Sequence, residues 1–209
     1  MPRRNVEVDK LVDAMKQAGA ALRDADIRFA LAGGLACWAR GGPATDHDVD
    51  LLVKPEDAEA ALEACVTAGM RPERPPEAWL FKAYHDETPV DLIFAPAGGP
   101  VTDELLDRAD EREVMAMRLP VSSLEDVLAT KLLALTEQEP DYGAVLEIAR
   151  TLREQIRWDE VREKTNGSPF AKAFFTLIDE LGILPEEHGG TRGSRVKLSP
   201  SSLSLSKGR

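Results

Sequence analysis

Three aspartates are the residues of this sequence whose side chains are best suited to chemistry. Asp48 and Asp50 stand in the stretch DVDLLV, and Asp91 stands in VDLIF. Side chains alternate between the two faces of a strand, so Asp48 and Asp50 project to one side and their apolar neighbours to the other. Two adjacent carboxylates repel each other, more so when buried, and a divalent cation removes that repulsion. Ligation by oxygen alone favours Mg²⁺ or Mn²⁺.

The three carboxylates form one cluster if the strand of Asp91 pairs with the strand of Asp48 and Asp50. Such a cluster can hold two metal ions, which together stabilise the attacking and the leaving oxygens of an in-line phosphoryl displacement. A second register would pair Asp46 with Asp48. We prefer Asp48 and Asp50 because LLV follows directly and anchors that pair on the strand, so Asp46 is expected in the incoming loop.

A glycine pair stands upstream of the aspartates, between the apolar run IRFALA and a short helical stretch. Gly33 and Gly34 would let the backbone approach a triphosphate closely, and the amide groups at a helix start favour anionic oxygens. A glycine pair alone usually marks a turn, and an Asp-X-Asp pair alone is common. The order of strand, glycine pair, helix, Asp-X-Asp and a later apolar-flanked aspartate is much more specific.

Hydrophobic periodicity indicates the elements that must position these residues. Helical spacing predicts helices over residues 6–24, 35–40 and from Pro55 to Gly69. β-like runs predict strands over residues 27–32, 48–53, 79–84, 90–94 and 114–119, with a hairpin turn over residues 86–89. From Ser122, which has capping-box spacing to Glu125, the pattern is helical only, with later helices over residues 145–152 and 168–182. We expect an α/β core over residues 1–120, a helical region over residues 121–184 and a flexible tail over residues 185–209.

Composition restricts the class of protein. The 209 residues are 43% hydrophobic and 30% charged, as in ordinary globular proteins. No apolar run approaches the roughly 20 residues that span a bilayer, and no signal peptide is recognisable, so we expect a cytoplasmic protein that does not bind membranes. Two cysteines and three histidines lack zinc-ligand spacing, and the cysteines should be reduced and buried. The net charge of −11 disfavours broad nucleic-acid binding and is compatible with metal cations or a cationic substrate.

The stretch LAGGLACWARGGPATDHDVDLLV, residues 31–53, resembles the signature of the DNA polymerase β-like nucleotidyltransferase superfamily. It is especially similar to the small bacterial branch that includes AbiEii-like toxins of type IV toxin–antitoxin systems and the aminoglycoside nucleotidyltransferases. The resemblance covers about residues 25–140. It implies a mixed sheet with flanking helices, followed by a C-terminal helical region.

The resemblance also implies roles for individual residues. Asp48, Asp50 and Asp91 would hold two Mg²⁺ ions, with Mn²⁺ as a possible substitute, and Asp91 would also be the general base. Gly33 and Gly34 would contact the triphosphate of a nucleoside triphosphate (NTP). Thr45, next to the acidic pair, is a further candidate for the nucleotide site.

The helix predicted from SSLEDVLATKLLAL, residues 122–135, resembles the family's helix that presents a lysine to the nucleotide. Lys131 interrupts its apolar stripe, so this side chain either extends to solvent or reaches into a site. The pattern alone leaves both open, and the resemblance favours phosphate contact. Two features depart from the family: no arginine directly precedes Thr45, and only Asp141 remains of a paired-aspartate motif. Nucleotide selection or acceptor placement should therefore differ from better-known relatives.

The function implied is transfer of a nucleoside monophosphate from an NTP to an acceptor hydroxyl. The leading expectation is an RNA 3′ end, with tRNA as the acceptor and a cognate antitoxin as partner. Basic residues of the tail would contribute contacts to RNA: Arg192, Arg195, Lys197, Lys207 and Arg209. The alternatives are a small hydroxyl acceptor such as an aminoglycoside near Asp86, Glu87 and the acidic region 103–113, a protein hydroxyl, or a degenerate module that only binds a partner. The intact set of three aspartates disfavours the last.

Overall fold

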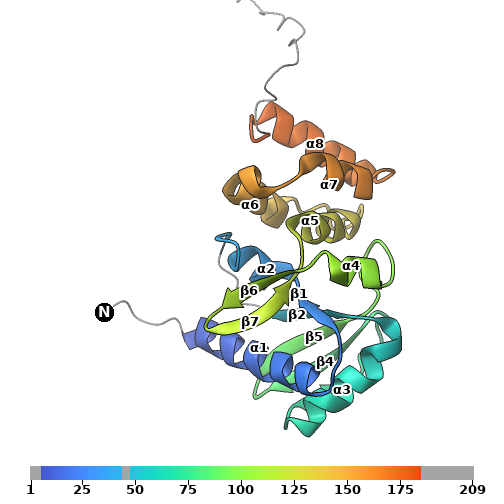
Figure 1. Ribbon diagram of the computed structural model, residues 1–209. Coiled ribbons are helices and arrows are strands. Elements are labelled where there is room, and N and C mark those ends of the chain that lie inside the picture. Colours follow the sequence, from blue (N-terminus) through green and yellow to red (C-terminus); the bar gives the residue numbers. More distant parts are fainter. Residues whose placement is uncertain (1–5, 44–47, 185–209) are drawn as a thin grey trace, which may run out of the picture.

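The structure, a computed structural model, describes residues 6–43 and 48–184. Its N-terminal part is built on a seven-stranded mixed sheet with the strand order β3-β4-β5-β2-β1-β7-β6 (Figure 1). The pairs β2–β5 and β1–β7 are parallel, and the other neighbours are antiparallel. The strands are β1 (Phe29–Leu31), β2 (Val49–Val53), β3 (Arg71–Glu73), β4 (Leu80–His85), β5 (Thr88–Ile93), β6 (Asp110–Val114) and β7 (Met117–Val121).

The two faces of the sheet are covered unequally. Helices α1 (Val6–Asp24) and α3 (Ala58–Thr67) pack on one face, where the alternate residues Val49, Leu51 and Val53 of β2 are fully buried. On the other face, Leu52 belongs to a smaller apolar cluster with residues around the short helix α4 (Asp103–Asp107). Helix α2 (Gly33–Trp38) follows β1 directly. The lightly covered face is the one to which Asp50 points.

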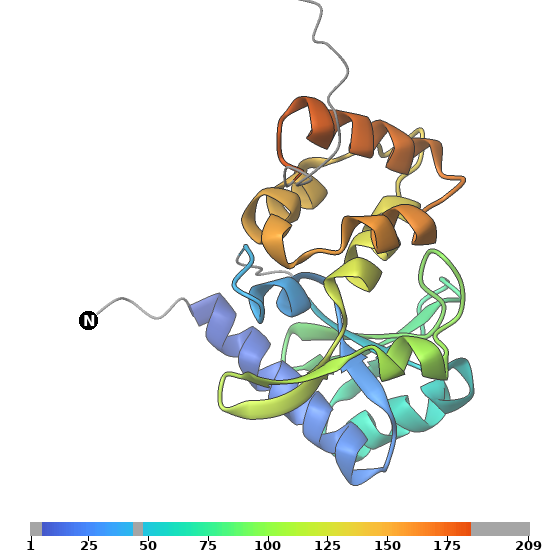
Figure 2. The ribbon, with the colours of Figure 1, turned by 45° about the horizontal axis from the view of Figure 1, so that its top comes forward.

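Four helices follow the sheet: α5 (Leu124–Leu133), α6 (Gly143–Leu152), α7 (Trp158–Lys164) and α8 (Pro169–Glu180). Helix α5 contacts α2 on one side and α6, α7 and α8 on the other. In Figure 2 these yellow to red helices form a layer beyond the end of the sheet, with α5 nearest to it. Ile148 and Phe174 of this layer belong to the same buried cluster as Leu51, so one apolar core runs through both parts.

Several sequence-based predictions need correction. The single strand predicted over residues 114–119 is instead the hairpin of β6 and β7, whose turn residues Met115 and Ala116 both have positive φ. The cap of α5 is Ser123, whose side chain accepts from the amide of Asp126, because the amide of Ser122 still donates to Leu31 in the sheet. The edge strand β3, whose residues are all exposed, and the helix α4 were not predicted.

The predictions for two helices and for the cysteines are confirmed. The first helix has the predicted bounds, and Ser168 caps α8 with Pro169 in its first turn. Cys37 and Cys65 are free and buried. Within the described ranges, no helix is long and apolar enough to cross a membrane. Thr45, Asp46 and the tail over residues 185–209 lie outside the described residues.

Candidate metal and nucleotide site

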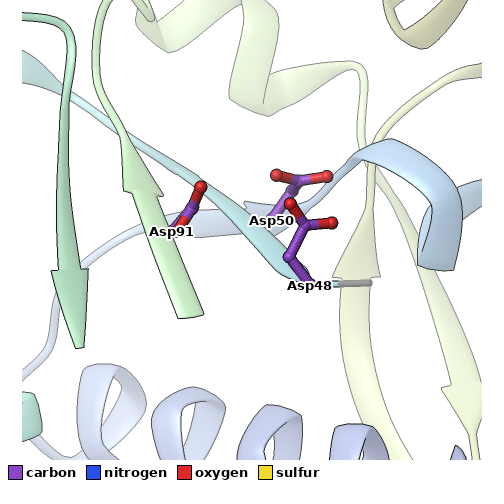
Figure 3. A group of neighbouring side chains, drawn as sticks. All are labelled: Asp48, Asp50 and Asp91. Carbon is purple, nitrogen blue, oxygen red and sulfur yellow. The ribbon is translucent and has the colours of Figure 1, made fainter. Parts of the chain in front are cut away.

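The three aspartates come together on the lightly covered face of the sheet. The parallel register of β2 and β5 sets Asp50 directly opposite Asp91, and Asp48 immediately precedes β2. One carboxylate oxygen from each residue lies within 4.8 Å of the other two (Figure 3). Asp91 is buried, and Asp48 and Asp50 are half-buried. The arrangement offers a compact set of hard oxygen donors, which fits Mg²⁺ or Mn²⁺.

The electrostatics of the cluster favour a bound cation. Burial, followed by the charges of Asp48 and Asp91, raises the pKa of Asp50 to about 7, while Lys131 and Lys82 oppose this shift. Burial also raises the pKa of Asp91, against the opposing effect of Lys82. The two lysines therefore offset only part of the negative charge. A divalent cation among these oxygens would relieve the remaining repulsion.

The first glycine of the pair lies against Asp50. Gly33 has a φ of +56°, and a Cβ atom at this position would stand 1.7 Å from Oδ2 of Asp50. The amide of Ala32 also donates to the backbone carbonyl of Asp50 at 2.9 Å. We expected the backbone at Gly33 to lie close to a triphosphate. In the structure, the group close to Gly33 is the carboxylate of Asp50. Gly34 is the half-buried second residue of α2.

A fourth charged residue, which was not predicted, contacts the cluster from β4. Lys82 is the antiparallel partner of Asp91, and its Nζ donates to Oδ1 at 2.7 Å and to Oδ2 at 2.9 Å. The Lys82 side chain is 27% exposed, whereas that of Asp91 is 8% exposed. The two-residue turn at residues 86–87 places Lys82 opposite Asp91, whereas the turn expected over residues 86–89 would place Tyr84 there.

A cavity of about 540 Å³ lies next to Asp50, between the sheet and α5. Lys131, half-buried on α5, lines this cavity together with Gly33, and its charge lowers the pKa of Asp50. Lys131 and Asp50 therefore line the same cavity. The rest of the wall is largely apolar, with Leu52, Trp79, Ile93 and Val127.

Ser122 gives the cavity a polar feature. This residue is buried, lines the cavity, and its Oγ has no hydrogen-bond partner among the described residues. Buried hydroxyl groups normally have a partner, so this one is suited to a polar group of a ligand or to an ordered water. The sequence showed Ser122 only as a candidate helix cap.

In the acidic region over residues 103–113, considered above for a cationic acceptor, the three aspartates are paired with arginines. Asp103 and Asp107 bind Arg28 at 2.7 and 2.6 Å, and Asp110 binds Arg40 at 3.0 Å. These carboxylates already have cationic partners within the chain. The cavity beside Asp50 is therefore the better candidate for a ligand site.

No family model matches the chain, and no curated protein is significantly similar to it. Among solved structures, the solution structure of the antibiotic-resistance factor ANT(2″)-Ia is similar, with a TM-score of 0.55, 15% identity, and coverage of 82% of this chain and 96% of that one. The crystal structure of ANT(2″)-Ia in complex with adenylyl-2″-tobramycin gives a TM-score of 0.55 at 16% identity, covering 78% and 98%. A putative nucleotidyltransferase from Thermotoga maritima is more distant, with a TM-score of 0.46 at 15% identity, covering 81% and 92%. The likeness to ANT(2″)-Ia confirms the predicted fold class, a mixed α/β sheet with flanking helices and a C-terminal helical region.

Proposed function

We propose that this protein is a nucleotidyltransferase that transfers a nucleoside monophosphate from an NTP to an acceptor hydroxyl. The observation that carries the proposal is the convergence of Asp48, Asp50 and Asp91 within 4.8 Å on one face of the sheet. The adjoining cavity, which Lys131 lines, supports it. The likeness of the fold to ANT(2″)-Ia supports it further.

The roles we propose follow from the positions of the side chains. Asp48, Asp50 and Asp91 would hold two Mg²⁺ or Mn²⁺ ions, which would neutralise charge on the triphosphate and on the departing pyrophosphate. Asp91 accepts the proton of the acceptor hydroxyl, whose oxygen attacks the α-phosphorus as the bond to pyrophosphate breaks. Lys131 binds phosphate oxygens from the cavity side. Gly33 and Gly34 present backbone amides. Thr45, which lies outside the described residues, stays a candidate for the same nucleotide site from the sequence resemblance alone.

A small molecule that carries a hydroxyl group is the acceptor we favour. The structure of ANT(2″)-Ia with adenylyl-2″-tobramycin holds a nucleotidylated small molecule on a similar fold. The cavity of about 540 Å³ is in the range of small-ligand pockets. A net charge of −11 disfavours a large polyanion. The tRNA-directed toxin with a cognate antitoxin, which the sequence resemblance implies, is then the second outcome to be tested.

The test is transfer of label from each of the four α-³²P NTPs in the presence of Mg²⁺. The acceptors are an aminoglycoside panel, total tRNA and a protein extract, and the Asp48→Asn variant is the control. Magnesium-dependent labelling of a small molecule would support the favoured acceptor, and labelling of tRNA would support the toxin. No transfer to any acceptor would contradict the enzymatic proposal and leave a module that only binds a partner.

A further inference from the structure

Lys82, Asp91 and Asp50 form a row across three neighbouring strands. Lys82 pairs with Asp91 between β4 and β5, and Asp91 pairs with Asp50 between β5 and β2. Directly paired residues in adjacent strands place their side chains about 5 Å apart on one face. One cation and two anions are therefore held side by side by the sheet itself.

The aspartates of the cluster differ in whether they form an ion pair. Both oxygens of Asp91 accept from Nζ of Lys82, at 2.7 and 2.9 Å. No ion pair involves Asp48 or Asp50 in the part of the chain that the structure describes. Among the described residues, the acidic cluster thus consists of two carboxylates without an ion pair, Asp48 and Asp50, and a third that already has a cation.

Lys82 brings its positive charge directly against Asp91. Its Nζ lies 2.7 Å from Oδ1 and 2.9 Å from Oδ2 of that carboxylate, and its side chain is 27% exposed. A lysine ammonium is a compact point charge with three donors. A divalent cation placed on Asp91 would stand beside this charge and repel it, whereas a cation on Asp48 and Asp50 would lie one strand further away.

We infer that Lys82 takes the place of one of the two divalent cations, so that the nucleotide-free protein binds a single ion at Asp48 and Asp50. A second ion binds Asp91 only after Lys82 has left that carboxylate. Lys82 is in this account a positioning residue, which holds Asp91 beside Asp50 until the second ion replaces it. The inference rests on the proposed function, because it concerns the metal site of that reaction.

The number of bound Mn²⁺ ions tests this inference without any turnover. Electron paramagnetic resonance of the nucleotide-free protein should titrate to one Mn²⁺ per chain, with the spectrum of an isolated ion. Lys82→Met removes the ammonium and keeps most of the apolar stem, so it should bind two ions. Because ions in two-metal sites lie about 3.5–4 Å apart, their spectrum should show spin coupling.

Matched variants separate the role of the charge from a change in folding. Lys82→Arg keeps a cation and should bind one ion, and Lys82→Gln, which lacks the charge, should bind two. Lys54→Met removes a half-buried lysine that pairs with Glu56 and Asp103 outside the cluster, and it should bind one ion. Circular dichroism identifies the folded variants, which are the ones to be compared.

Two ions on the unaltered protein would overturn the inference, as would a single ion on folded Lys82→Met and Lys82→Gln. No bound Mn²⁺ on any of these proteins would overturn both the inference and the metal-dependent function. One ion on the unaltered protein and two on Lys82→Met, without nucleotidyl transfer to any acceptor, would support the inference and contradict the proposed function alone.

Discussion

Oδ2 of Asp50 lies 1.7 Å from the point at which a Cβ atom on residue 33 would stand. The carboxylate therefore fills the space that any residue other than glycine would need at the start of α2. Gly33 also has a φ of +56°, in the left-handed region that favours glycine. Glycine at this position and the placement of Asp50 in the cluster thus depend on each other.

Gly33→Ala should displace Asp50 and weaken metal binding. We expect a loss of about 1–3 kcal/mol in the free energy of unfolding from backbone strain, and at least about tenfold weaker Mn²⁺ binding. Gly69→Ala is the matched control, because Gly69 has a φ of +91° but no atom within 4 Å of the added Cβ. Gly69→Ala should also lose stability through backbone strain, but it should bind Mn²⁺ with the affinity of the unaltered protein. Equal Mn²⁺ affinity in both variants, measured by titration, would refute the link between Gly33 and Asp50.

Asp50→Asn should stabilise the metal-free protein while removing its response to metal. Asp50 is half-buried beside Asp48 and Asp91, so its charge is repelled by both neighbours when no cation is present. We expect a higher melting temperature than that of the unaltered protein in EDTA, and little further increase on addition of Mg²⁺. The unaltered protein should show a clear increase with Mg²⁺, because ligand that binds only the folded state stabilises it. A lower melting temperature of Asp50→Asn in EDTA would contradict this view of the cluster.

Asp126 should make stability depend on pH. This buried carboxylate accepts from Arg108 and Ser123 and pairs with Lys164 of α7 at 3.0 Å. Burial raises its pKa, but these partners lower it more, and the net pKa is below the ordinary 3.8. Its contribution is therefore fully present above about pH 4 and is lost as the pH falls through the depressed folded-state pKa.

Asp126→Asn measures that contribution. At pH 7 the substitution should cost about 1–3 kcal/mol in the free energy of unfolding, since the buried carboxylate loses its charged hydrogen bonds to the exposed Arg108 and its ion pair with the half-buried Lys164. The cost should shrink as the pH falls below about 4, because Asp126 becomes protonated first in the unfolded chain and then, at lower pH, in the folded protein. Urea denaturation at pH 7 and pH 3 gives both values. A cost that is the same at the two pH values would show that the charge of Asp126 is not what stabilises the contact between α5 and α7.

Lys131→Met should weaken nucleotide use while leaving the fold and the metal site intact. Its ammonium lines the cavity next to Asp50, where it would stabilise charge on the phosphates. We expect kcat/KM for the NTP to fall about 10²–10³-fold, with Mn²⁺ stoichiometry unchanged. Lys172→Met, an exposed lysine on α8, is the control and should have no effect. An unchanged kcat/KM in Lys131→Met would contradict phosphate contact by Lys131 and favour a side chain that extends to solvent.

Much of the fold was predictable because side chains alternate between the two faces of a strand. In β2, Val49, Leu51 and Val53 face the helices, so Asp50 had to face the opposite side together with Leu52, and a cluster with Asp91 followed once β2 and β5 were neighbours. The hairpin of β6 and β7 gave no such signal. Met115 and Ala116 occupy its turn with positive φ, although neither is a residue that usually marks such a turn. The edge strand β3 buries no side chain, so no apolar pattern marks it.

The register of one hairpin explains why Lys82 was missed. A turn assigned to residues 86–89 sets Tyr84 opposite Asp91, whereas the actual turn at residues 86–87 sets Lys82 there. Pro89 suggested the longer turn, but it stands inside β5, opposite Tyr84. A shift of two residues keeps every side chain on its face, so the apolar pattern cannot detect it. Lys131 was identifiable from its position on an apolar stripe, but its direction required the tertiary packing of α5 against the sheet.

The central claim is that the three aspartates hold the metal ions for nucleotidyl transfer, and Asp48→Asn tests it most directly. The measurement is Mg²⁺-dependent transfer of α-³²P label by the variant and the unaltered protein, with melting temperature as the check on folding. We predict that turnover falls at least about 10³-fold, since a ligand of the metal is lost, while the protein stays folded. Turnover equal to that of the unaltered protein would contradict the assignment of the site.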